Sequence, residues 1–128
     1  IYVSSTSENG LINDSEIEKA FRSVDRKYFV PKGFEDIAYS DQPLREENMH
    51  ISAPHIYASV LEALELKPKS SLSFLNIGSG TGYLSSIVAT VLGPRSLNYG
   101  VEIHKKNVDH SRLSISEWQK SKKSVCGK

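Results

Sequence analysis

The segment from Ser71 to Tyr83 constrains the fold of this chain more than any other. An apolar run ends in three glycines at alternate positions, Gly78, Gly80 and Gly82, and a helical pattern of apolar residues follows. This order predicts a strand, a tight turn and a helix, which is how an α/β nucleotide site begins. A side chain at these glycines would block close approach of the backbone to a ligand. The N–H groups at the start of the helix suit a carboxylate or a phosphate.

The glycine spacing separates the known kinds of nucleotide loop. A P-loop requires a lysine after its glycines, and none follows here. The third glycine also comes one residue too early for the dinucleotide fingerprint. Gly-x-Gly-x-Gly after a strand resembles the S-adenosylmethionine loop of Rossmann-like methyltransferases. Glu102 lies about 20 residues further on, at the end of the next predicted strand, where an acid can hold ribose hydroxyls. Together these features favour a nucleotide-type cofactor site over a glycine turn without a ligand.

Length and composition limit the alternatives. The 128 residues suffice for one small domain, and the formal net charge of +1 indicates neither nucleic-acid nor membrane binding. One cysteine, Cys126, cannot form a disulfide within the chain, so we expect a reducing, cytoplasmic compartment. No apolar run reaches the roughly 18 residues of a membrane span, and the N-terminus has no basic and apolar leader. The four histidines lack metal-binding spacing, so no metal site is expected.

Helices before the glycine segment are signalled by caps and apolar spacing. Residues 1–10 are predicted to be a flexible lead-in. Ser15 and Glu18 form a capping box that predicts a helix ending near Asp25. Residues 28–49 show no period and predict an irregular arm. Ser52 and Pro54 open a second helix. Its predicted buried stripe consists of Ile56, Tyr57, Val60, Leu61 and Leu64.

The remaining elements complete a strand–helix–strand unit. They are a helix over residues 83–92, a strand over 97–103, a helix over 105–119 and a polar basic tail over 120–128. Such a unit implies a parallel sheet with a right-handed crossover. The predicted fold class is α/β: a Rossmann-like class I methyltransferase fold with a parallel-sheet core and helices on both faces. Residues 11–119 would form its N-terminal portion, truncated after the second core strand and the following helix.

Two motifs together resemble the protein-L-isoaspartate O-methyltransferase family. They are Ser52-Ala53-Pro54-His55 and the segment from Leu75 to Gly82, and the resemblance extends from about Leu11 to Val108. It implies S-adenosylmethionine as cofactor and the α-carboxylate of L-isoaspartyl residues in damaged proteins or peptides as acceptor. It also implies a site for each motif residue. Gly78, Ser79, Gly80 and Gly82 would approach the methionine part of the cofactor, and Glu102 would hold its ribose. Ser52 would be the active-site serine and would also border the cofactor, together with Ile51 and Tyr57.

The implied reaction needs few polar residues. An acceptor carboxylate is ionised at pH 7 and is already a nucleophile, and a sulfonium is already an activated leaving group. The protein must only align the two and exclude water. Ser52 would then orient the carboxylate by hydrogen bonding, although the same serine also suits a plain helix cap, and the two roles are compatible.

Three departures from the family pattern support an alternative. Asn76 stands where methyltransferases usually carry an acid, residues 48–51 differ from the usual Gly- and Thr-containing stretch, and the later family elements have no counterpart. These features resemble the family's "domain-containing" branch. That resemblance implies a non-catalytic binding module or a ubiquitin-ligase adaptor with protein partners, which keeps the cofactor fold. The short chain leads us to expect little or no activity from these residues alone.

Overall fold

An aspartate side chain caps the N-terminus of helix α2 (Ser15–Ser23). The computed structural model describes residue 10 and residues 12–126, so the lead-in expected over residues 1–10 lies almost entirely outside the described residues. Asp14 is the N-cap: its Oδ1 accepts hydrogen bonds from the N–H groups of Glu16 and Ile17 at 2.8 and 3.2 Å. The predicted cap, Ser15, was wrong by one residue because the aspartate before it satisfies these two N–H groups itself.

A β-hairpin interrupts the predicted irregular arm. Two short 3₁₀ helices, η1 (Arg26–Tyr28) and η2 (Glu35–Ile37), are followed by strands β1 (Leu44–Glu46) and β2 (Met49–Ile51). The strands pair antiparallel with Leu44 opposite Ile51. The irregular arm therefore contains a hairpin that was not predicted, because strands of three residues are too short to show a clear alternation.

Helix α3 (Pro54–Ala63) presents a different face to the core than its apolar pattern predicted. Its N-cap is Ala53, with no side-chain hydrogen bond, so Ser52 does not cap the helix. The buried positions are Pro54, Ala58 and Leu61. Three members of the predicted stripe are exposed, namely Ile56, Val60 and Leu64. Packing through the small Ala58 turns these larger side chains outward.

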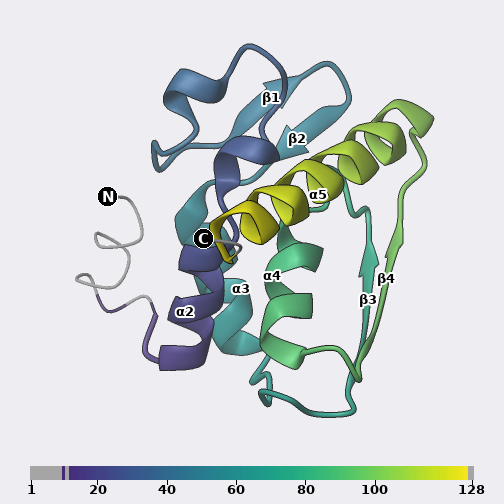
Figure 1. Cartoon of the computed structure of the whole chain (residues 1–128). Helices are drawn as coiled ribbons and strands as arrows, with labels where there is room; N and C mark the ends of the chain where they lie inside the picture. Colours follow the sequence, from purple (N-terminus) through teal and green to yellow (C-terminus); the bar gives the residue numbers. More distant parts are fainter. Residues whose placement is uncertain (1–9, 11, 127–128) are drawn as a thin grey trace.

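The strand–helix–strand unit forms as predicted. Strand β3 (Ser73–Ile77), helix α4 (Tyr83–Leu92) and strand β4 (Leu97–Val101) follow one another, and the two strands pair in parallel from Ser73 opposite Leu97 to Ile77 opposite Val101. The structure therefore confirms the α/β class with a parallel pair. In Figure 1 the two strands lie at one side of the molecule, with α4 and α5 on the same side of them.

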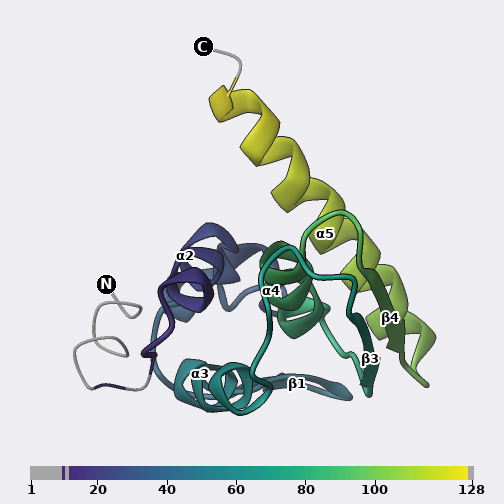
Figure 2. The same cartoon turned by 90° about the horizontal axis from the view of Figure 1, so that it is seen from below.

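Helix α5 (Lys105–Cys126) extends beyond the expected boundary at Gln119. The basic residues expected to form a tail are helical up to residue 126, and residues 127–128 lie outside the described part. The Lys122 ammonium stacks on the Trp118 ring one turn earlier in the same helix, 4.5 Å from its centroid, which stabilises this turn of α5. Figure 2 shows the C-terminal turns of α5 projecting past the other helices.

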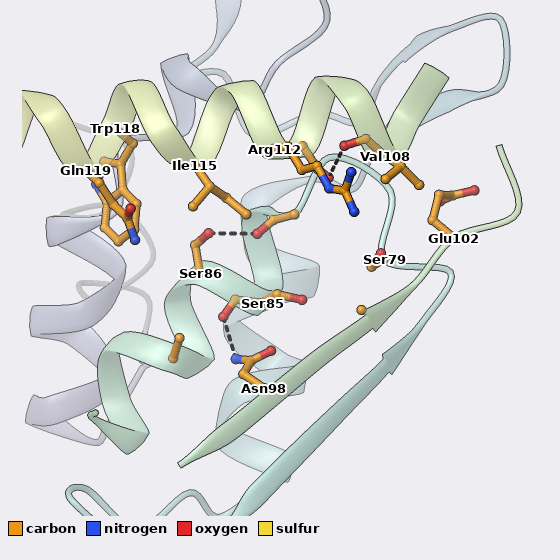
Figure 3. Close-up of a pocket in the computed structure, with 14 residues that line it drawn as sticks. Ser79, Ser85, Ser86, Asn98, Glu102, Val108, Arg112, Ile115, Trp118 and Gln119 are labelled. Atoms are coloured by element: carbon orange, nitrogen blue, oxygen red, sulfur yellow. Dashed lines mark hydrogen bonds between the residues drawn. The ribbon is translucent and has the colours of Figure 1, made fainter. Parts of the chain in front are cut away.

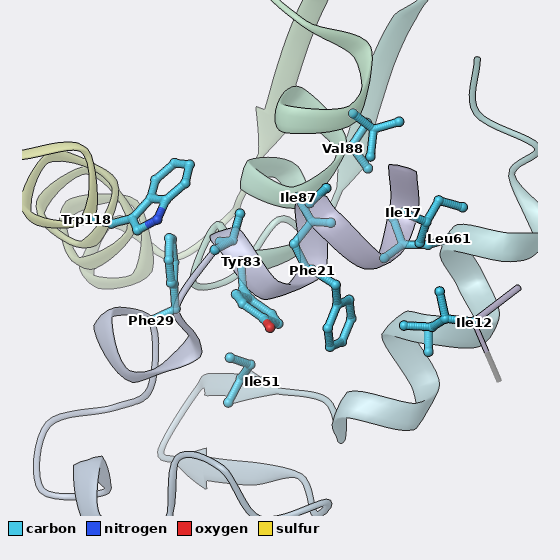
Figure 4. Close-up of a cluster of buried hydrophobic side chains, with 14 of the residues drawn as sticks. Ile12, Ile17, Phe21, Phe29, Ile51, Leu61, Tyr83, Ile87, Val88 and Trp118 are labelled. Carbon is cyan, nitrogen blue, oxygen red and sulfur yellow. The ribbon is translucent and has the colours of Figure 1, made fainter. Parts of the chain in front are cut away.

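Tyr83, the first residue of α4, is at the centre of the hydrophobic core (Figure 4). Its ring lies 5.4 Å from Phe29, 5.2 Å from Tyr57 and 6.2 Å from Phe21, measured between ring centroids. Phe29 in turn contacts Trp118 of α5 at 6.1 Å. The core thus joins α2, the arm, α3 and α5 around the residue that follows the glycine loop.

One face of the parallel pair remains exposed in the part of the chain that the structure describes. Alternate strand residues point away from α4, and their large apolar side chains are solvent-accessible: Leu75, Ile77, Leu97, Tyr99 and Val101. Neither strand carries a charged residue. Helices were expected on both faces, whereas α4 and α5 cover only one. Parallel sheets are normally covered on both faces, so this apolar face favours a packing partner.

We therefore expect this chain to self-associate through the exposed sheet face. Tyr99→Lys should shift the distribution towards monomer in sedimentation velocity, raising the dissociation constant of the associated form by about tenfold, because a buried charge is costly. Leu113→Lys is a matched control, since Leu113 on α5 is 59% exposed, as is Tyr99. A wild-type chain that stays monomeric at the highest attainable concentration would contradict this expectation.

Candidate functional site

The glycine loop leaves β3 and turns tightly against the hairpin. Gly80 has a φ of +52°, in the left-handed region that favours glycine. A Cβ at this position would lie 3.3 Å from the backbone oxygen of His50 in β2. Glycine therefore permits both the turn and the close approach of the loop to the hairpin.

Glu102, directly after β4, binds the glycine loop. Its Oε2 accepts a hydrogen bond from the Gly80 N–H at 2.9 Å, and its Oε1 accepts one from the His104 N–H, also at 2.9 Å. The hydrogen bond from His104 has the largest effect and, with that from Gly80, holds the pKa of Glu102 below its ordinary value, although desolvation opposes this. The sequence predicted that Glu102 and the loop belong to one site, and the structure brings them together.

The glycine loop also requires a glycine outside the triplet, at position 100 of β4. A Cβ on Gly100 of β4 would lie 2.8 Å from Oγ of Ser79 in the loop. No side chain fits there unless the loop moves. The absence of a side chain at Gly100 therefore allows the loop to lie against β4. This requirement becomes visible only when β3 and β4 are paired in parallel, since the pairing brings the loop next to Gly100.

Ser52 lies between β2 and α3, held on both sides of its backbone. Its N–H donates to Oη of Tyr57 at 3.0 Å, and its carbonyl oxygen accepts from Nη1 of Arg26 at 2.9 Å. The hydroxyl oxygen lies 3.5 Å from Nε2 of His50. Ser52 caps no helix and lines the neighbouring hollow.

That hollow has a volume of about 240 Å³. It gathers five of the predicted site residues, Ser52, Tyr57, Gly78, Ser79 and Gly80. The sequence missed His50, which also lines it. Other lining residues are Ile56, Val60, Asn76, Thr81 and Leu84. The side chain of Ile51, by contrast, is fully buried in the core and is not among the lining residues.

A second hollow, of about 330 Å³, lies on the other side of the loop between α4, β4 and α5 (Figure 3). It contains the remaining predicted residues, Gly82 and Glu102, and shares Ser79 with the first hollow. Hydrogen bonds within the protein use polar groups on its wall: Asn98 Nδ2 donates to the Ser85 carbonyl oxygen at 2.9 Å. The predicted site residues are thus divided between the two hollows, with the glycine loop as the wall between them.

Burial shifts the pKa values of two side chains that line the first hollow. Desolvation, followed by the positive charges of Arg45 and Arg26, lowers the pKa of His50, so its imidazole is neutral at pH 7. Burial raises the pKa of Tyr57, which stays protonated. The first hollow therefore offers neutral polar groups beside the backbone of the loop.

Asn76 makes a contact that an acid would make differently. Its Nδ2 donates to Oγ of Ser85 on α4 at 3.1 Å. The amide thus links β3 to α4 next to the loop. An aspartate at this position could only accept a hydrogen bond from the same hydroxyl.

The described residues contain no cluster of three His, Cys, Asp or Glu side chains able to hold a metal ion. None of the helices in that part of the chain combines the length and the apolar character needed to cross a membrane.

A parallel strand, a glycine loop, a helix and an acid after the next strand define the nucleotide-cofactor part of a Rossmann-like α/β protein. The model of one family, Protein-L-isoaspartate(D-aspartate) O-methyltransferase (PCMT), matches residues 2–126. This chain belongs to that family.

Individual relatives give the same picture. The chain is 38% identical over 96 residues to the protein-L-isoaspartate O-methyltransferase of Methanothermobacter thermautotrophicus, covering 74% of this chain and 43% of the relative. It is 38% identical over 101 residues to protein-L-isoaspartate O-methyltransferase 1 of Arabidopsis thaliana, covering 78% and 43%. The chain thus spans less than half the length of these relatives.

A solved structure from Plasmodium falciparum has a similar fold. That protein, assigned as a protein-L-isoaspartate O-methyltransferase and solved in complex with S-adenosyl-L-homocysteine, superposes with a TM-score of 0.77 at 29% identity. The match covers 91% of this chain and 54% of the other.

Proposed function

We propose that this chain forms an S-adenosylmethionine site and serves methyl transfer to the α-carboxylate of L-isoaspartyl residues in damaged proteins. The observation that carries the proposal is the hydrogen bond from the Gly80 N–H to Glu102 at 2.9 Å, which fixes the acid against the loop. The family membership and the S-adenosyl-L-homocysteine bound by the Plasmodium falciparum protein support this cofactor.

The residues present fit such a cofactor. Gly80 borders the first hollow without a side chain of its own, and Glu102 is an ionised carboxylate with lone pairs beyond those given to the two backbone N–H groups. Gly78, Ser79, Gly80 and Gly82 would surround the methionine part, and Glu102 would accept from ribose hydroxyls. Tyr57 would line the reacting end.

The chain's own residues need only hold and orient the acceptor. When bound, the cofactor supplies an activated methyl group. The acceptor carboxylate would take this methyl group, which would give a methyl ester and leave S-adenosylhomocysteine. Ser52 would donate its hydroxyl proton in a hydrogen bond to this carboxylate, and the neutral His50 would orient the hydroxyl. No residue has to remove a proton.

The relatives favour catalysis over an adaptor role, since those that the chain matches carry the name of the enzyme. The corresponding partners are isoaspartyl-containing proteins or peptides, and the proposal includes neither nucleic acid nor a membrane. The low cysteine content supports a reducing, cytoplasmic compartment.

Calorimetric titration with S-adenosylhomocysteine, followed by methylation of an isoaspartyl peptide, tests the proposal. Saturable binding is expected, together with weak methyl transfer that requires the isoaspartyl linkage and is absent with the aspartyl isomer. Binding without transfer would favour the non-catalytic module. No binding by a chain that circular dichroism shows to be folded would overturn the proposed cofactor site.

Glu102→Gln is expected to weaken S-adenosylhomocysteine binding by roughly tenfold or more, because hydrogen bonds to a charged acceptor contribute about 1.5–3 kcal/mol.

The pKa of Glu102 is lowered, so its carboxylate is ionised and its stabilising contribution complete above the ordinary glutamate pKa. That contribution is lost as the pH falls through the lowered pKa. The carboxylate therefore gives wild-type binding no pH dependence between about pH 6 and pH 8. Calorimetry should show this, with Glu117→Gln on the exposed side of α5 as the control. Equal affinities for both variants would exclude the role of Glu102.

A further inference from the structure

Arg26 is a fully buried arginine beneath the proposed acceptor side of the site. Its guanidinium donates to three backbone carbonyl oxygens from separate segments. Nε donates to Ala38 at 2.9 Å, Nη1 to Ser52 at 2.9 Å and Nη2 to Gln42 at 3.3 Å. One side chain thus connects the arm with the residues just before α3.

Arg26 also lies beside the residue that follows the glycine loop. Its Cζ is 5.6 Å from the ring centroid of Tyr83, the first residue of α4. Tyr57 packs edge-on against the same ring and accepts the hydrogen bond from the Ser52 N–H. The two polar groups of the Ser52 backbone are therefore held by two side chains, Arg26 and Tyr57, that both rest on Tyr83.

We propose that Arg26 is a positioning residue that fixes Ser52 relative to the glycine loop and thereby sets the affinity of the site for an acceptor carboxylate. This inference rests on the proposed function. Arg26 is buried behind Ser52 and lines neither of the two hollows. Its effect on a ligand is exerted through the Ser52 carbonyl on the acceptor side, whereas Glu102 holds the cofactor side of the loop.

Lysine cannot replace Arg26 in this role. The guanidinium presents N–H groups in a planar fork that reaches three carbonyls at once, whereas an ammonium is a single point at the end of a flexible chain. Arg26→Lys retains the positive charge and removes the fork. It should leave Ser52 free to shift while the glycine loop and Glu102 remain in place.

The test compares two ligands on the same protein. S-adenosylhomocysteine is titrated first, and a labelled isoaspartyl peptide is then titrated into the saturated protein, with the aspartyl isomer as a peptide control. Arg26→Lys should weaken isoaspartyl-peptide binding by about tenfold and leave S-adenosylhomocysteine affinity within about twofold of wild type. Arg95→Lys is the matched control, because the Arg95 guanidinium also donates to a backbone carbonyl, that of Lys69, away from the site.

The outcomes separate the two proposals. Wild-type protein that binds neither ligand overturns the proposed function. Wild-type protein that binds both, with Arg26→Lys unchanged for the peptide or equally weakened for both ligands, overturns the positioning role alone. If Arg26→Lys does not fold, Arg26→Gln decides. Its amide N–H groups can still donate to one of the three carbonyls but cannot form the fork, and a selective loss of peptide binding is again expected. Unchanged peptide binding in folded Arg26→Gln, or equal weakening for both ligands, would overturn the inference.

Discussion

Gly80→Arg is expected to abolish S-adenosylhomocysteine binding, with a loss of at least about 100-fold in affinity, or roughly 2.7 kcal/mol. Position 80 has a positive φ, and its Cβ would already lie 3.3 Å from the His50 carbonyl oxygen. The long side chain must then extend into the space where the loop approaches the ligand. Calorimetric titration measures the loss, and circular dichroism shows whether the variant is folded.

A second glycine provides the control for backbone strain. Gly33 in the arm also has a positive φ, of +91°, and a Cβ there would meet nothing within 4 Å. Gly33→Arg should thus carry a comparable conformational cost, of about 1–2 kcal/mol, and bind normally. If Gly80→Arg bound S-adenosylhomocysteine as tightly as Gly33→Arg, the loop would not be the cofactor site.

Phe29→Ala is expected to destabilise the fold by about 3–5 kcal/mol. Phe29 is fully buried, and its ring contacts Tyr83 of α4 and Trp118 of α5. Truncation leaves a cavity where the arm, α4 and α5 meet. Because domains are stable by only about 5–15 kcal/mol, this loss removes a large fraction of the total stability. Urea unfolding followed by circular dichroism measures the change.

Leu113→Ala is the comparison for Phe29→Ala. Leu113 is an apolar residue on α5 with 59% of its surface exposed, so its truncation should change the free energy of unfolding by less than about 0.5 kcal/mol. Similar unfolding midpoints for the two variants would mean that Phe29 does not connect the arm to the helices.

Local chemistry accounts for the features that the sequence predicted correctly. The strand–helix–strand unit was predicted from an apolar run, from glycines that permit the turn, and from Gly93 with Pro94, which end α4. Glu102 was predicted to belong with the loop because the ends of adjacent parallel strands meet at one edge of a sheet. Each of these signals acts over a few residues or over one repeat of the fold.

Contacts between distant segments account for the errors and omissions. The face of α3 depends on whether Ala58 or a larger neighbour meets the core, and apolar spacing alone favoured the larger side chains. The fork of Arg26 joins carbonyls 12, 16 and 26 residues away, which no local pattern encodes.

The sequence by itself determined the fold class, the glycine loop and the acid that accompanies it, because these depend on backbone conformation and on residue spacing. Only the tertiary structure decided which residues surround the loop. It placed His50 and Ser52 on one side and Glu102 on the other, and it left one apolar face of the sheet exposed. The physical reason is that burial and hydrogen bonding are settled by packing between elements, and packing is fixed only when the whole chain has folded.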